Sequence, residues 1–339
     1  MSWRISLAVR IAIIGCGGFA GVHARRLQAI PEAEVVALQD VSQEQLDRFY
    51  ARWYGDAAAP PSCFVDRGEM YASAKPDAVV ICTPHTLHFE HGMEAFSQGC
   101  HVLMEKPMVT NVRDAVRLEN AAAGKVLIVG YNTPCTSAFR ELKNVLTSGM
   151  LGELQMVTGW LSQDWKNLTQ GMWRQEPSRS GGGQMYDSGA HLFNSLVWSV
   201  DLPVKEVFAV VDNRDTAVDI NGVAVIKFEN GPIANIMISG DCAQDGAGMT
   251  FIFSDGLLEV DGWGGSFLKY KSRGEGDWIV PELDESSNPD QNFVRSILGE
   301  EMPLATGRHG ILQSQLMDAI YESARTGRPV SPDRDFETV

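Results

Sequence analysis

The chain has 339 residues, of which 44% are apolar and 21% charged, values typical of a globular protein with about two domains. Its net charge of −15 repels phosphate backbones and anionic lipid, so nucleic acid and membrane surfaces are not expected as partners. The sequence contains no apolar run long enough for a transmembrane helix, and its scattered cysteines lack a CxxC pair, which favours a reducing, cytoplasmic compartment.

The first part of the chain alternates between strands and helices. After a short N-terminal tail, β-branched apolar runs are followed by helical stretches that begin at capping residues or end at glycine. We expect strands at 9–14, 34–39, 77–82, 101–104 and 125–130, and helices at 19–30, from Ser42 to about 53, from the Thr83-Pro84 turn to 98, and from Thr110 or Asn111 to 123. This order predicts a doubly wound parallel sheet, the Rossmann arrangement.

The pattern changes near residue 131. A helix over 137–148 is followed by strand-like runs joined by short turns, which suit antiparallel hairpins, and a last helix covers about 305–326. The expected strands are 153–162, 206–213, 223–229, 233–239, 250–254, 257–260 and 267–271. The sequence therefore predicts an N-terminal α/β domain over 1–133 and a C-terminal α+β domain over 134–339 with an open-faced, mostly antiparallel sheet. The last helix could pack back towards the N-terminal domain.

A glycine motif, GxGxxA, lies between the first strand and the first helix. Glycine at its first two positions permits a tight turn and close approach of a pyrophosphate, which the helix N-terminus then binds. Its expected cofactor-binding residues are Gly15, Gly17, Gly18, Phe19 and Ala20. The alternative is a turn with a structural role only.

Asp40 ends the second strand, 20 residues after Ala20, where a carboxylate accepts hydrogen bonds from the adenosine ribose hydroxyls. It would repel the 2′-phosphate of NADP, and no Arg or Lys occupies 41–43, so NAD is the expected cofactor. Alternatively, Asp40 only caps the helix that begins near Ser42.

Lys106 follows a predicted strand, within Glu105-Lys106-Pro107. Ligands of open α/β sheets bind outside the carboxyl ends of the strands, so this lysine is placed to meet a substrate. A lysine there can stabilise the alkoxide that develops when a hydroxyl is oxidised. The alternative is an ordinary surface lysine.

A second glycine-rich block covers 181–191 and contains Asp187 and His191. Four residues apart, these two would share one face of a helix. His191 suits general-base work on an alcohol, and the acid could orient the ring or hold substrate. A zinc pair is the first alternative, but no third ligand has metal-like spacing, so no metal is expected. A helix-terminal acid with a structural histidine is the second.

In this order the motifs resemble the glucose–fructose oxidoreductase / inositol dehydrogenase / rhizopine catabolism (Gfo/Idh/MocA) family. The resemblance covers nearly the whole chain and rests on segments 15–20, 83–88, 99–107, 181–191 and 318–328. It implies that Lys106, Asp187 and His191 form the catalytic group, with His191 as the proton acceptor. It also implies that the C-terminal sheet mediates oligomer contacts, giving a homodimer or homotetramer. The residues it places beside the nicotinamide are Thr83, Pro84, His85, His88 and Glu105, together with Lys106; alternatively, His88 hydrogen-bonds locally.

Two positions depart from the pattern of many family members. Asn194 stands where they carry Asp, and Thr133-Pro134 follows Asn132 where they carry Arg. Tryptophans precede the glycine block, and we expect Trp160 in the core. The expected substrate-binding residues are Lys106, Asn132, Trp173, Arg174, Asp187, His191 and Asn194.

These features predict an NAD-dependent dehydrogenase of a sugar, sugar derivative or cyclic polyol. His191 would accept the hydroxyl proton while Lys106 stabilises the developing alkoxide. One alternative is a tightly bound NAD recycled in internal oxidoreduction or oxidative glycoside cleavage. The other is a non-catalytic NAD-binding sensor.

Overall fold

The computed structural model describes residues 8–333, so the predicted tail at 1–7 lies outside the described residues. The chain forms two compact units. The described parts of the first unit are 8–108, 117–130 and 288–307, and those of the second are 109–116, 131–287 and 308–333. Each unit therefore combines segments that are far apart in the sequence.

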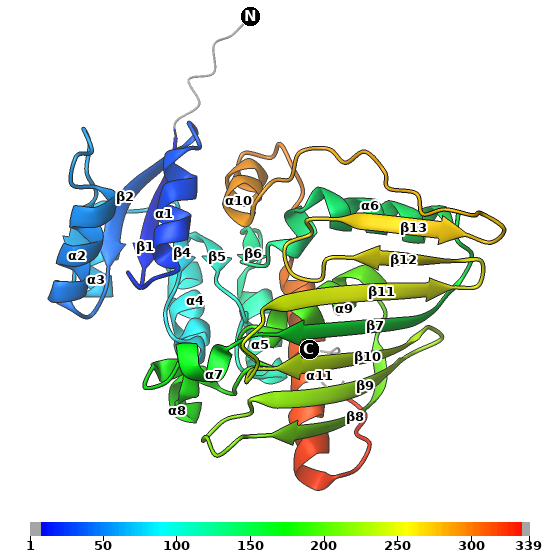
Figure 1. Ribbon diagram of the computed structural model, residues 1–339. Coiled ribbons are helices and arrows are strands. Elements are labelled where there is room, and N and C mark those ends of the chain that lie inside the picture. The colour runs from blue at the N-terminus through cyan, green and yellow to red at the C-terminus, as the bar shows by residue number, and fades with distance from the viewer. Residues whose placement is uncertain (1–7, 334–339) are drawn as a thin grey trace, which may run out of the picture. The chain divides into compact units, whose positions relative to one another are not determined.

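The first unit contains a six-stranded parallel sheet in the order β3-β2-β1-β4-β5-β6, which confirms the Rossmann prediction (Figure 1). Its strands are β1 (Val9–Ile14), β2 (Ala33–Gln39), β3 (Ser62–Phe64), β4 (Ala78–Ile81), β5 (His101–Met104) and β6 (Leu127–Val129). The strand order reverses between β1 and β4, and this switch point is where open α/β sheets bind ligands. The glycine turn follows β1 at this point.

Helices flank this sheet. They are α1 (Ala20–Gln28), α2 (Gln43–Trp53), α3 (Arg67–Ala74), η1 (His85–Leu87), α4 (His88–Ser97) and α10 (Pro289–Ile297), while α5 (Val112–Ala121) contributes residues to both units. Ser42 caps α2 by accepting a hydrogen bond from the Gln45 amide, as its position predicts. Sequence reasoning missed β3, α3 and α10. The last of these packs against α1, β5 and β6.

The second unit contains a seven-stranded sheet in the order β13-β12-β11-β7-β10-β9-β8 (Figure 1). Its strands are β7 (Leu154–Ser162), β8 (Val204–Asp212), β9 (Asn221–Phe228), β10 (Ile233–Ser239), β11 (Gly246–Phe253), β12 (Gly256–Val260) and β13 (Leu268–Ser272). The mostly antiparallel sheet is confirmed, but an arrangement of hairpins throughout is wrong. Strands β7 and β10 run parallel, because β7 is inserted between two later strands.

One face of this second sheet is covered by helices. They include α6 (Ser137–Ser148), α9 (Gly189–Val200) and α11 (Gly307–Thr326), which lie on the same side of the sheet in Figure 1. Their apolar side chains join the inward-facing residues of the strands in one continuous core, to which Phe193, Phe251 and Leu316 belong. The shorter helical turns of this unit are η2 (Thr133–Cys135), α7 (Trp165–Leu168), η3 (Trp173–Gln175) and α8 (Pro177–Ser180).

The opposite face of the second sheet is open and apolar. Strand pairing places Trp160, Met237, Val223 and Val210 in one row across β7, β10, β9 and β8. All four side chains are exposed. The prediction that Trp160 belongs to the core is wrong, because its position in β7 points it to the open face, where it is 46% exposed. Within residues 8–333, no helix has both the length and the apolar character needed to cross a membrane.

Candidate active site

The glycine turn has the geometry of a phosphate cradle. Gly15 has a φ of +87°, and a Cβ there would lie 2.9 Å from the backbone of Cys82, so only glycine fits. A Cβ added at Gly17 or Gly18 would meet nothing within 4 Å, so the backbone at these positions is open to a ligand. The α1 helix begins at Ala20, and its first amide groups complete an anion site. The structure therefore fits a dinucleotide pyrophosphate at the predicted residues.

Asp40 links the glycine turn to α2. Its carboxylate accepts hydrogen bonds from the backbone amides of Cys16, at 2.9 Å, and Ser42, at 3.0 Å. Gln45 closes the same turn by donating its side-chain amide to the Cys16 carbonyl at 2.5 Å. A carboxylate oxygen can accept more than one hydrogen bond, so Asp40 retains capacity for ribose hydroxyls. Ser42, rather than Asp40, is the N-cap of α2.

Glu105, beside Lys106, belongs to a buried charged triad. The His23 ring lies between two carboxylates, with Nε2 at 3.0 Å from Glu105 and Nδ1 at 2.7 Å from Asp290. Burial disfavours a charged imidazole, but Asp290 outweighs it and raises the pKa of His23 well above its ordinary value. A Cβ at Gly130 would lie 2.6 Å from the Glu105 carboxylate, so glycine is required there. The Glu105 side chain is thereby fixed next to the backbone amide of Lys106, 3.3 Å away.

The 83–88 loop is held by a second buried histidine. His88 places its two ring nitrogens 2.7 Å from the Pro107 carbonyl and 2.9 Å from the Thr83 carbonyl. His88 therefore ties this loop to the segment after Lys106, and its contacts are structural. His85 is buried and lies edge-on to His88, with ring centroids 5.8 Å apart. Pro84 precedes the η1 turn that carries His85.

In the second unit, Asp187 is anchored by two side chains. One carboxylate oxygen accepts a hydrogen bond from Trp165 Nε1 at 2.8 Å and another from Arg174 Nε at 3.1 Å. The Arg174 guanidinium also lies 4.6 Å from the ring centroid of Trp173. The structure thus brings the predicted residues Asp187, Arg174 and Trp173 together and adds Trp165, which sequence reasoning did not assign to the site.

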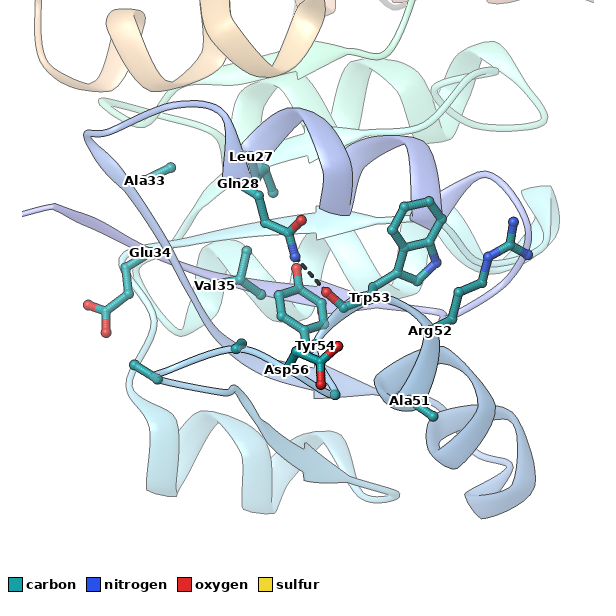
Figure 2. A pocket seen from close by; sticks show the side chains of 13 residues that line it. Leu27, Gln28, Ala33, Glu34, Val35, Ala51, Arg52, Trp53, Tyr54 and Asp56 are labelled. Carbon is teal, nitrogen blue, oxygen red and sulfur yellow. Dashed lines mark hydrogen bonds between the residues drawn. The ribbon is translucent and has the colours of Figure 1, made fainter.

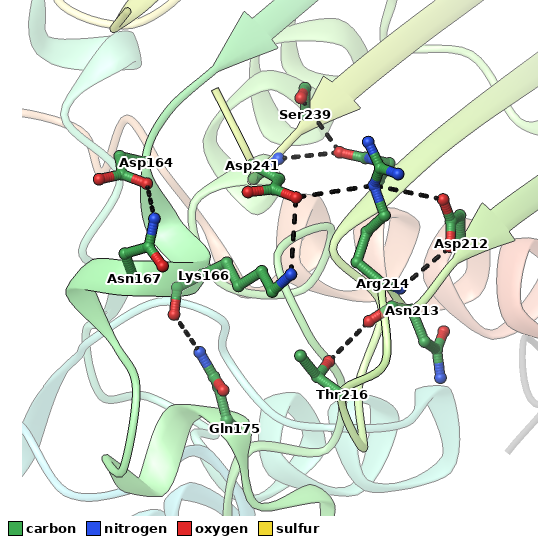
Figure 3. A network of polar contacts seen from close by, with 12 residues as sticks. Asp164, Lys166, Asn167, Gln175, Asp212, Asn213, Arg214, Thr216, Ser239 and Asp241 are labelled. Carbon is green, nitrogen blue, oxygen red and sulfur yellow. Dashed lines mark hydrogen bonds and ion pairs between the residues drawn. The ribbon is translucent and has the colours of Figure 1, made fainter. Parts of the chain in front are cut away.

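A polar network fixes the helical turn α7 that carries Trp165 (Figure 3). Lys166 donates its backbone amide to the Gly240 carbonyl and places its ammonium 3.6 Å from Asp241. Asp241 is also 3.7 Å from the Arg214 guanidinium, and Gln175 donates to the Lys166 carbonyl. These contacts join α7 to the ends of the sheet strands and hold the indole against Asp187.

His191 lies on α9 between two aromatic rings and is 6% exposed. Tyr131 meets it edge-on at 5.7 Å, and Trp263 lies 4.5 Å away at an angle of 50°. Trp263 belongs to a loop fixed by Asp261, which accepts hydrogen bonds from the backbone amides of Trp263 and Ser266. Sequence reasoning missed Trp263, because only the packing of this loop brings it to His191.

Asp187 and His191 do not share a helix, so that part of the prediction is wrong. Helix α9 begins at Gly189, and Asp187 lies in the preceding turn, where its amide donates to the Gly183 carbonyl. The turn packs against Asp219, which accepts hydrogen bonds from the amides of Gly183 and Met185 at 2.7 and 2.8 Å. A Cβ at Gly183 would lie 2.0 Å from the Asp219 carbonyl oxygen, so the glycines follow the path of this buried acid.

The other predicted substrate residues differ in burial. Asn132 precedes the η2 turn, which Thr133 ties to α9 through a 3.1 Å hydrogen bond with Ser195. Asn194 is 1% exposed and donates to Gln313 at 3.1 Å. Asn194 therefore supports the packing of α9 against α11.

The described part of the chain contains no cluster of three or more His, Cys, Asp or Glu side chains able to hold a metal ion. Residues 9–133 match the family model described as "Oxidoreductase family, NAD-binding Rossmann fold", and residues 139–267 match the model "GFO/IDH/MocA C-terminal domain". Together the two matches cover most of the chain.

Curated relatives include D-glucoside 3-dehydrogenase of Escherichia coli, 26% identical over 96% of this chain and 98% of the relative. Myo-inositol 2-dehydrogenase of Thermotoga maritima is 26% identical over 67% of each chain. Among solved structures, the WlbA dehydrogenase of Bordetella pertussis in complex with NADH and UDP-GlcNAcA has a TM-score of 0.81 at 24% identity, covering 97% of this chain and all (100%) of the other. The matched domains and the two-unit fold show that this chain belongs to the Gfo/Idh/MocA family of oxidoreductases.

Proposed function

We propose that this chain is an NAD-dependent dehydrogenase that oxidises a carbinol of a sugar, a sugar derivative or a cyclic polyol. The observation that carries the proposal is the position of His191, nearly buried between Tyr131 and Trp263 on the helix that follows the anchored Asp187. Family membership and the names of the curated relatives, which act on glucosides and inositol, support the substrate class.

The cofactor would be held by residues of the first unit. Gly15, Gly17 and Gly18 with Phe19 and Ala20 would bind the pyrophosphate, and Asp40 would accept the ribose hydroxyls. Thr83, Pro84, His85, His88 and Glu105 would line the nicotinamide end. When bound, NAD supplies the carbon that accepts the hydride.

The chain's own residues would handle the proton and the charge. His191 accepts the hydroxyl proton, since imidazole exchanges protons near neutral pH. The Lys106 ammonium stabilises the negative charge that develops on the oxygen. Asp187 holds Arg174 and Trp165 in place, so Arg174 and Trp173 can orient the substrate together with Asn132. In this scheme residues 1–133 bind cofactor, and 134–339 bind substrate and mediate assembly.

The test is NAD⁺ reduction measured across monosaccharides, alkyl glucosides, inositols and sugar acids. On the best substrate we expect His191→Ala and Lys106→Ala each to lower kcat by about 10²- to 10⁴-fold. Lys125→Ala removes a lysine of the first unit that lies outside the proposed site, and it should keep wild-type turnover. Full turnover in Lys106→Ala would contradict the assigned mechanism.

The same experiment separates the two alternatives. NAD that co-purifies and survives dialysis, with no net NADH formed from added substrate, would indicate a cofactor recycled within each turnover. NAD binding without any conversion of substrate would indicate a sensor. Either result would refute the dehydrogenase proposal.

We further propose that a second copy of the chain covers the open face of the second sheet. The exposed row formed by Trp160, Met237, Val223 and Val210 is an apolar surface of the kind that homodimers bury. A charge at its centre, Trp160→Glu, should reduce the molecular mass measured by light scattering to that of a monomer. Met302→Glu adds the same charge at an exposed position of the first unit and should leave the assembly intact.

A further inference from the structure

A cavity of 460 Å³ lies between α1 and α2, beside the glycine turn. Gly17 and Gly18 line one end of it. Three arginines line the rest: Arg25 from α1, and Arg48 and Arg52 from α2. None of the described residues that line the cavity is acidic, although the chain as a whole carries a net charge of −15.

The spacing of these arginines explains their convergence. Arg48 and Arg52 are four residues apart, so they lie on one face of α2, and Gln45 lies on the same face. The helix is held near α1 by Trp53, since a Cβ at Gly21 would lie 2.6 Å from its indole ring. This close approach brings Arg25 to the same cavity.

The acidic groups near the cavity do not neutralise it. Glu44 lies 3.5 Å from Arg48, but the two side chains are 79% and 65% exposed, so water and salt screen the pair. Asp47 accepts a hydrogen bond from Gln43, and Asp40 is engaged by the glycine turn. Positive charge is therefore concentrated in the cavity.

Among the described residues, Arg25 and Arg52 have no carboxylate partner. Arg25 makes no hydrogen bond or ion pair with any residue of that range. Arg52 has its guanidinium 5.2 Å from the ring of Trp53. Figure 2, which views a neighbouring cavity of 440 Å³ that shares Arg52 and Trp53, shows the Arg52 side chain extended away from Asp56 and Glu34.

Three guanidinium groups around one cavity suit a doubly charged oxyanion. Arginine donates paired hydrogen bonds to phosphate oxygens, and a phosphate monoester carries nearly two negative charges near neutral pH. The open backbone at Gly17 and Gly18 allows close approach of the ligand. The volume exceeds that of a single phosphate group, and the indole of Trp53 offers an apolar surface to an organic part.

We propose that the cavity between α1 and α2 is a binding site for a phosphate monoester. Two sources share this chemistry: a phosphate on the ribose of a dinucleotide bound at the glycine turn, and a separate phosphorylated metabolite. The three arginines lie outside positions 41–43, which carry no Arg or Lys. The site is defined by equilibrium binding, so it stands or fails independently of the proposed dehydrogenase activity.

The experiment is calorimetric titration of the full chain with inorganic phosphate, NAD⁺ and NADP⁺. The proteins are wild type, Arg48→Gln, the double variant Arg25→Gln/Arg52→Gln, and the control Arg295→Gln, which removes an exposed arginine from α10 of the same unit. We expect the Kd for phosphate to rise about tenfold or more in both cavity variants, since a hydrogen bond to a charged group contributes about that factor. The control should bind phosphate as the wild type does.

The NADP⁺ and NAD⁺ titrations identify the source. Weaker binding of NADP⁺ but not of NAD⁺ in the cavity variants would assign the site to a ribose phosphate. Unchanged binding of both dinucleotides, with weaker phosphate binding, would assign it to a separate phosphorylated ligand. The proposal is overturned if wild type shows no saturable phosphate binding, or if all four proteins bind phosphate equally, as they would if it occupied the glycine turn.

Discussion

The buried triad of His23, Glu105 and Asp290 makes a quantitative prediction. His23→Leu would leave two carboxylates without the imidazole that now lies 3.0 and 2.7 Å from them, and their side chains are only 8% and 0% exposed. Removing one partner of a buried ion pair costs about 3–5 kcal/mol, because the remaining charge is neither solvated nor paired. We expect a loss of this size in the free energy of unfolding at about pH 6.

The loss should depend on pH in a defined direction. Burial opposes the charged form of His23, but Asp290 raises its pKa well above that of the unfolded chain. A raised histidine pKa stabilises the fold fully below the unfolded value of about 6.5, and this contribution declines as the pH rises through the folded value. The difference between wild type and variant should therefore be larger at about pH 6 than at about pH 9.

Urea unfolding followed by circular dichroism measures these differences. The matched variants are Asp290→Leu and the double variant His23→Leu/Asp290→Leu. Because the two side chains are in direct contact, the double variant should lose less than the sum of the single losses. A loss below about 1 kcal/mol in His23→Leu at pH 6, or strict additivity of the two losses, would refute this account of the triad.

Two further predictions concern the second unit. Gly183→Ala should destabilise the protein by about 3 kcal/mol, because the added Cβ would lie 2.0 Å from the backbone oxygen of Asp219, whereas Gly17→Ala, with nothing within 4 Å, should leave the unfolding midpoint unchanged; equal midpoints for the two variants would contradict the packing described here. Burial raises the pKa of Asp318 to about 6, although the Val112 amide opposes this. The folded state then holds the proton more tightly than the unfolded state, so this acid lowers stability as the pH rises from about 4 to about 6, and Asp318→Asn should gain up to about 3 kcal/mol above that range. Parallel melting curves of variant and wild type across this range would show that the carboxylate is not responsible.

Local signals in the sequence predicted most of the first unit. The apolar run of β1, the glycine turn after it and the Ser42 cap act within a few residues, so each is readable from its own segment. His23 carried a weaker signal, as a polar side chain on the apolar face of α1. Its partner Asp290 could not be found, because the pair is separated by 267 positions.

The second unit was harder to predict for the same reason. Each strand of its sheet has a recognisable pattern, but the insertion of β7 beside β10 depends on long-range pairing. The start of α9 was also misjudged. Gly181 adopts a φ of +77°, and the glycines after it follow the surface of Asp219, so the helix begins only at Gly189. Trp263 reaches His191 through a loop whose course is set by packing.

The placement of α10 has a consequence for the order in which the chain can fold during synthesis. Helix α10 packs on α1, β5 and β6, and it supplies the Asp290 carboxylate to His23. A ribosome has therefore completed the whole second sheet, through β13, before it produces the last element of the first unit. Until then the imidazole of His23 has only Glu105 as a carboxylate partner within this triad. The nascent first unit should consequently remain open to proteases and chaperones until α10 emerges, and a fragment that ends before residue 288 should lack part of its stability.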